Sequence, residues 1–213
     1  MTSNRNTIIR SMHDLGAAAW FGGTLMGAIG VNGASKDVKD PTERAKVAAA
    51  GWGRWAPVSA AAIGAHLVGA TGLLLANRDR VRDQRGAGAN TVIKTVLTAA
   101  AIGTTAYSGI IGAKIATEAS ADQAEGEGEI LPSAGAAPVE GGTVPSEGTP
   151  DKVAKLQQQQ RILQWVTPAL TGGILILGAQ QGEQQRASEQ IRTRDWSSVV
   201  KSAVDRLPKL MAS

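Results

Sequence analysis

Four long stretches without a single charged residue dominate the pattern of this sequence of 213 residues. An α-helix rises about 1.5 Å per residue, so about 20 apolar residues cross the hydrocarbon core of a bilayer. A surface helix of a soluble protein instead carries charged residues every few positions along its wet face. The pattern therefore predicts an all-α, polytopic membrane protein, a bundle of four transmembrane helices. The four stretches are Leu15–Ser35, Trp55–Asn77, Thr95–Ala113 and Ile162–Gly182.

The segments around these stretches divide the chain further. We predict spans at about 15–35, 55–77 and 92–117, so that residues 1–117 contain the first three transmembrane helices. Residues 118–149 are acidic and rich in Gly, Pro, Ala and Ser, without Lys or Arg. Such a composition buries too little apolar surface to fold and predicts a disordered external loop. A fourth helix is predicted over 150–182, because Thr149 is a suitable N-cap and Pro150 suits the first helical position.

Two shorter segments outside the spans have helical signals of their own. Asp40-Pro41-Thr42-Glu43 has the spacing of a capping box and predicts a short helix ending near Ala50. In the cytoplasmic amphipathic tail, residues 183–213, apolar residues recur at helical spacing. This spacing predicts a C-terminal amphipathic interfacial helix in the headgroup layer, with docking against the protein's own inner loop as the alternative. The apolar face comprises Trp196, Val199, Val200, Ala203, Val204 and Leu207.

The distribution of basic residues predicts an orientation. Of the 22 Lys and Arg residues, 13 fall on the side of the two termini and nine on the other side. By the positive-inside rule we expect both termini in the cytoplasm of a bacterial inner membrane. Trp52, Trp55 and Trp165 then lie on the outer side, where an aromatic belt is expected. Because the basic residues cluster beside spans, we expect the lipid bilayer, and no nucleic acid, as their partner.

The first and second spans each have a stripe of small residues on one helix face. In lipid, such stripes allow two helix backbones to approach closely. We therefore expect these helices to pack against each other, or against a copy in a homo-oligomer or another membrane protein. The stripe of the first span is His13, Gly16, Trp20, Gly23, Gly27 and Gly30. That of the second is Val58, Ala62, Ala65, Gly69, Gly72 and Ala76.

The start of the first span has a recognisable local motif. His13, Trp20, Gly22 and Gly23 follow the order H-x6-W-x-G-G, which resembles the start of a helix in the copper-resistance D type of membrane domain. That family is linked to copper handling, with histidines as the suspected ligands, so the resemblance implies a ligand role for His13. The chain departs from a metal-handling protein in having no Cys and no Met cluster. Its whole layout is similar to uncharacterised four-span membrane proteins of actinobacteria, for which membership implies no activity.

His66 is the second candidate for chemistry. It lies in the middle of the second stretch, and an ionisable residue near the bilayer midplane is a functional hypothesis by default. We expect His13 at the membrane surface, about 16 Å away along the helix axis. The two histidines are therefore not expected to share one metal ion or haem within a subunit. The commoner arrangement is a neutral His66 hydrogen-bonded to a neighbouring helix, with Tyr107, Thr167 and Thr171 as candidate partners.

Several activities are disfavoured by what the sequence lacks. It has no Cys, which excludes thiolate metal sites and thiol catalysis, and it has no recognisable catalytic or nucleotide-binding motif. The absence of charge from the four stretches argues against proton-coupled transport. We expect a non-catalytic or accessory membrane protein without a cofactor, associating through its glycine-rich first helix. The alternatives are a copper- or haem-linked protein using His13, His66 or both, and a small channel or carrier for an uncharged solute.

Overall fold

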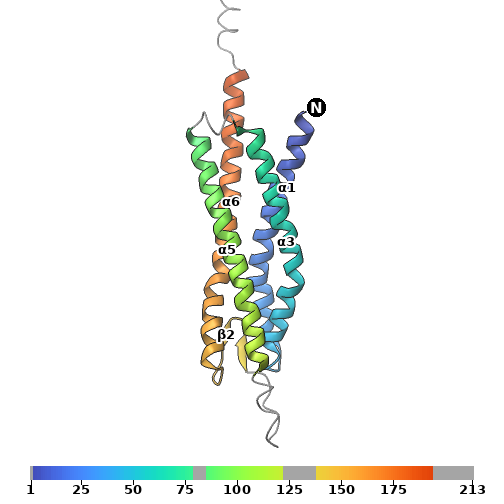
Figure 1. Ribbon diagram of the computed structural model, residues 1–213, viewed down its shortest axis with the longest axis vertical. Coiled ribbons are helices and arrows are strands. Elements are labelled where there is room, and N and C mark those ends of the chain that lie inside the picture. Colours follow the sequence, from blue (N-terminus) through green and yellow to red (C-terminus); the bar gives the residue numbers. More distant parts are fainter. Residues whose placement is uncertain (1, 79–84, 122–137, 194–213) are drawn as a thin grey trace, which may run out of the picture. The chain divides into compact units, whose positions relative to one another are not determined.

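The computed structural model describes residues 2–78, 85–121 and 138–193. Most of this part of the chain lies in four long helices, as the all-α prediction requires (Figure 1). These are α1 (Thr2–Met26), α3 (Arg44–Ala76), α5 (Arg85–Ala121) and α6 (Asp151–Thr193). The short turns η1 (Gly27–Val31), α2 (Asn32–Ala34) and η2 (Ser35–Asp37) continue α1, and β1 (Val139–Gly141) pairs antiparallel with β2 (Val144–Pro145).

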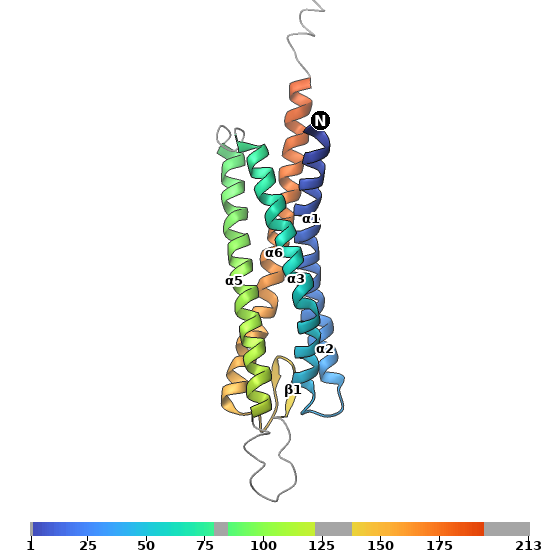
Figure 2. The same ribbon diagram turned by 45° about the vertical axis from the view of Figure 1, so that its right-hand side comes forward.

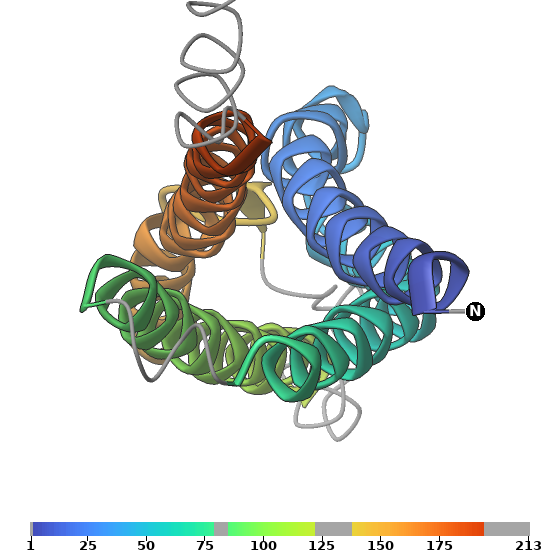
Figure 3. The same cartoon turned by 90° about the horizontal axis from the view of Figure 1, so that it is seen from above.

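The chain divides into two compact units, residues 1–175 and 176–213. Within the first unit, successive helices run in alternate directions (Figure 2). A view along the helices shows α1 beside α3, and α3 beside α5 (Figure 3). The described part of the second unit is the end of α6, residues 176–193. The predicted amphipathic helix from Trp196 to Leu207 lies outside the described residues.

Three helices are long and apolar enough to cross a membrane: α3, the segment Gly88–Glu118 of α5 and the segment Asp151–Gly182 of α6. They contain the second, third and fourth charge-free stretches, so these three have the length and composition that the sequence predicts. The first stretch differs because the α-helix ends at Met26 and a wider π-helical turn follows. A membrane span in α1 therefore stays a prediction.

Two apolar clusters hold the bundle together. In the first, Trp20 of α1, Ala62 of α3 and Ala101 of α5 are buried against each other, with Leu170 of α6 packed on them. In the second, Ile111 and Ile115 of α5 pack on Val153 of α6. Most of these side chains are small or β-branched, and small side chains allow the helix backbones to approach closely.

The segment around Asp40 differs from the prediction. The Asp40 carboxylate accepts hydrogen bonds from the Thr42 hydroxyl (2.6 Å) and the Thr42 N–H (2.9 Å), an Asx turn rather than a capping box. These hydrogen bonds hold the pKa of the Asp40 carboxyl below its usual value. The predicted end of a short helix at Ala50 is wrong, because α3 continues from Arg44 to Ala76 in one piece. Helix α3 packs extensively on α1, and such tertiary packing is the main source of helix stability in proteins.

The predicted disorder over 118–149 is wrong in its last part. Residues 122–137 lie outside the described residues, but α5 extends to Ala121 and residues 139–145 form a β-hairpin. Val139 of the hairpin is fully buried against Ala45 of α3. The composition argument considers only the apolar surface of the segment itself, whereas the hairpin is held by polar side chains of the helices.

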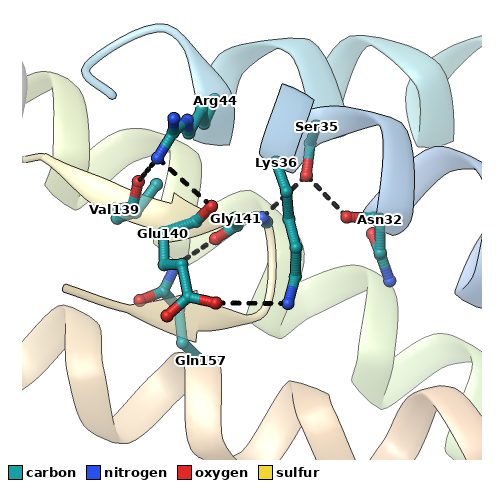
Figure 4. A network of polar contacts seen from close by, with 9 residues as sticks. Asn32, Ser35, Lys36, Arg44, Val139, Glu140, Gly141 and Gln157 are labelled. Carbon is teal, nitrogen blue, oxygen red and sulfur yellow. Dashed lines mark hydrogen bonds and ion pairs between the residues drawn. The ribbon is translucent and has the colours of Figure 1, made fainter. Parts of the chain in front are cut away.

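Those side chains surround the hairpin (Figure 4). The Arg44 guanidinium donates to the backbone carbonyls of Val38 (2.8 Å) and Val139 (3.2 Å). Ser35 Oγ accepts from the Gly142 N–H at 3.0 Å, and Gln157 Nε2 donates to the Gly141 carbonyl at 3.0 Å. The bonds to Val139, Gly141 and Gly142 satisfy backbone groups of the hairpin.

Substituting Arg44→Ala is expected to loosen the hairpin, because it removes the charged donor from two backbone carbonyls. We expect amide hydrogen exchange over residues 139–145 to become about tenfold faster. Lys46→Ala is the control, since Lys46 pairs with the neighbouring Glu43 at the surface and not with the hairpin. Equal exchange rates in the two variants would show that Arg44 does not anchor the hairpin.

Candidate functional site

The structure brings the two histidines together, and the predicted separation between them is wrong. The ring centres of His13 and His66 are 4.5 Å apart. The prediction assumed that the first helix begins with its charge-free stretch. Helix α1 instead begins at Thr2, which places His13 about three turns inside it. Because α3 runs in the opposite direction, His66 comes to the same level.

His66 joins three helices through its ring nitrogens. The side chain is 1% exposed, its Nδ1 lies 3.1 Å from the His13 carbonyl oxygen and its Nε2 lies 3.3 Å from Thr98 Oγ1. A carbonyl oxygen only accepts, so Nδ1 donates its proton there. The Thr98 hydroxyl can donate or accept, so a neutral imidazole accepts from it at Nε2. The imidazole thus links α3 to α1 and α5.

The partner of His66 is a threonine, but not one that the sequence indicated. Tyr107 donates to Gln159, Thr167 donates to Thr104 and Thr171 donates within its own helix. The sequence does not single out Thr98, because facing positions on antiparallel helices depend on their register, which the sequence does not show. The one indication of this partner in the sequence is the presence of a threonine, Thr98, in the third span.

Charged groups reach the edge of this histidine pair. His13 Nδ1 lies 2.7 Å from the carboxylate of Asp14, which is half exposed. Lys94 of α5 interacts electrostatically with Asp14 and with both histidines. The Trp20 ring centre lies 6.3 Å from that of His66, and its indole N–H donates to Thr105 at 3.1 Å. Charge is therefore absent from the four stretches but not from the helices that contain them.

Glycines bring the backbones of α1 and α3 together at the histidines. A Cβ on Gly16 would lie 2.5 Å from the Ala62 carbonyl oxygen and 2.6 Å from the backbone nitrogen of His66. A Cβ on Gly69 would overlap the backbone of His13, and one on Gly72 would lie 2.7 Å from Ile9. The stripe of α1 thus faces α3 of the same chain, the first of the two arrangements that the sequence left open.

The far end of the stripe faces aromatic rings. A Cβ on Gly23 would overlap the Trp55 ring, and one on Gly27 would overlap the Trp52 ring. These two tryptophans therefore pack on α1, whereas Trp165 is 49% exposed. The aromatic belt stays a prediction. The two remaining members of the predicted packing set are peripheral: Gly30 faces Met26 of its own helical run, and Ala65 is half-buried on α3.

The residues around the histidine pair do not fit a haem held between the two rings. Two axial imidazoles on opposite faces of a haem have ring centres roughly 6 Å apart, from metal–nitrogen bonds of about 2 Å. The observed 4.5 Å leaves no room for the macrocycle. A metal ion would have to displace a hydrogen bond of His66, and the described residues contain no cluster of three or more His, Cys, Asp or Glu.

Comparison of the chain with protein-family models, with curated proteins and with solved structures gives no match. The resemblance of the segment from His13 to Gly23 to the copper-resistance D type of domain therefore stays a prediction. What the structure itself defines is a class: a helical bundle with apolar helices long enough to cross a membrane.

Proposed function

We propose that this chain is a four-pass protein of the bacterial inner membrane with a non-catalytic, accessory role. Its exposed apolar side chains support α1 as the fourth span. Leu15, Met26 and Ile29 are 69%, 62% and 60% exposed, although α1 packs extensively on α3. Leu15 and Met26 lie in α1 and Ile29 in the following turn η1, and exposed apolar side chains of this kind suit contact with lipid.

The hydrogen bonding of His66 is the observation that best supports an accessory role. An ionisable side chain deep in a membrane bundle marks a functional site by default. Here both ring nitrogens are engaged within the chain, to His13 and Thr98, and the ring is buried. Such a residue joins helices and does not meet a substrate.

A metal-linked protein is the second candidate, supported by the 4.5 Å between the rings of His13 and His66. The two candidates differ in purified protein. The accessory role predicts colourless protein without stoichiometric metal. Copper bound in a one-to-one ratio, or a Soret band, that disappears in His66→Ala would overturn it.

Membrane insertion and topology test the proposal directly. We expect the full chain to stay with the membrane after carbonate extraction. Green fluorescent protein fused after Ser213 should fluoresce, and alkaline phosphatase inserted after Ser133 should be active, because four spans place these sites on opposite sides. Release by carbonate, or the reverse pattern of reporter activity, would contradict the proposed topology.

A further inference from the structure

A cavity of about 430 Å³ lies among the four helices of the first unit, next to the β-hairpin. This volume falls in the range of about 300–1,000 Å³ that is typical of small-molecule sites. The cavity exists because small residues line the facing surfaces of α3 and α5. Every residue that lines it belongs to the described part of the chain, and none of them is charged. The small residues include Gly53, Ala56 and Ala60 of α3 and Gly109, Gly112 and Ala113 of α5.

Two buried polar groups at the cavity wall lack a partner. Gln160 is 8% exposed, and its Nε2 donates to Ser108 Oγ at 2.6 Å. Its Oε1 has no hydrogen-bond partner among the described residues, and neither has the buried indole N–H of Trp55. Either orientation of the Gln160 amide leaves one of its polar atoms unpaired. Each of these atoms has less than 1 Å² of accessible surface, so its side chain must rotate before a molecule in the cavity can reach it. A buried polar group without a partner costs about 1–3 kcal/mol, so a molecule that pairs with either atom gains binding free energy.

A backbone carbonyl adds a further acceptor. Pro57 has no amide hydrogen, so the carbonyl of Gly53 lacks its usual helical donor. Gly53 has only backbone atoms, so its backbone lines the cavity. The polar groups therefore offer both a donor and acceptors, within a wall that is mainly apolar.

The β-hairpin and glycines of α3 and α5 border the cavity. At the hairpin, Gly142 packs on Ala48, and Thr143 is 5% exposed. On the other side, a Cβ on Gly53, Gly109 or Gly112 would meet open space. These glycines leave room for a molecule to enter between α3 and α5.

We propose that this cavity binds an uncharged, largely apolar molecule that bears a hydroxyl or amide group. That group both donates and accepts, as the unpaired atoms of Gln160 and Trp55 require. The molecule reaches the cavity from the bilayer. Only this route rests on the proposed membrane function, because the lining itself specifies the ligand chemistry.

Quenching of tryptophan fluorescence by 8-bromooctan-1-ol tests the proposal in the full chain in lipid nanodiscs. Bromine quenches an indole on contact, and Trp52 and Trp55 both line the cavity. We expect saturable quenching in the wild-type protein. Gly112→Leu should weaken binding at least about tenfold by filling the cavity. Gly103→Leu is the matched control, because Gly103 of α5 also has open space but does not line the cavity.

The polar end group is tested separately. We expect 1-bromooctane, which lacks the hydroxyl, to bind about tenfold more weakly than the alcohol. Gln160→Met should remove this preference. Quenching that rises linearly with probe concentration and is equal in all variants would show partitioning into lipid, and would overturn the proposal.

Failure of the binding site and failure of the proposed membrane function give different experimental results. If Gly112→Leu fails to fold, Gly109→Leu fills the same cavity from one turn earlier and replaces it. Saturable binding by a protein that carbonate releases from membranes would refute the proposed membrane function but not the binding site. Binding without saturation by a protein that stays in the membrane would refute only the site.

Discussion

Replacing Gly16 with alanine is expected to lower the free energy of unfolding by about 3 kcal/mol, although alanine is the better helix former. The added Cβ would lie 2.5 Å from the Ala62 carbonyl oxygen and 2.6 Å from the backbone nitrogen of His66. Both are backbone atoms of α3, so no side chain can rotate to relieve the overlap. The helices must separate, which also disrupts the hydrogen bond between His66 and the His13 carbonyl. Unfolding of the purified protein in mixed detergent micelles measures the loss.

Gly22→Ala is the matched control for Gly16→Ala. Gly22 lies on the same helix, and a Cβ there would meet nothing within 4 Å. Its replacement is expected to raise the unfolding free energy by about 0.5–1 kcal/mol, the usual gain from removing a helical glycine. Opposite signs for the two variants identify Gly16 as a contact residue. Equal effects of the same sign would refute the close approach of α1 and α3.

Replacing His66 with alanine is expected to lower the free energy of unfolding by about 3 kcal/mol and to leave the helical content unchanged. The variant removes a fully buried ring, leaves a void between α1, α3 and α5, and leaves the Thr98 hydroxyl without its acceptor. Interhelical hydrogen bonds in membrane proteins contribute on average only about 0.6 kcal/mol, so most of the effect comes from lost packing. The same detergent unfolding experiment measures it.

Two further variants separate the contributions at His66. Thr98→Val keeps the shape of the side chain but removes the hydroxyl, and is expected to cost about 1 kcal/mol. Leu67→Ala is the control for truncation, since Leu67 is adjacent in sequence but 39% exposed, and should cost less than His66→Ala. A stability of His66→Ala equal to that of the wild type would contradict a joining role for this residue.

The sequence alone predicts most of the helical content and the packing of the first helix on the second. Charge-free stretches identify α3, α5 and α6, because length and composition are local properties that a bilayer core selects directly. Thr149 and Pro150 locate the start of α6 to within one residue. The two glycine stripes indicate which faces of the first two helices are suited to close packing, since helical periodicity depends only on residue order.

The tertiary structure decides the site. The sequence could not show that α1 extends to Thr2 or that His13 meets His66, because helix register depends on how two packed surfaces fit. It could not show that Arg44, Ser35 and Gln157 would hold a hairpin that its own composition cannot stabilise. The cavity likewise arises only where small residues from two distant segments face each other. Local composition therefore determined the helices and the membrane-like character of this protein. Contacts between residues far apart in the chain decided the hydrogen bonds of His66, the hairpin and the cavity.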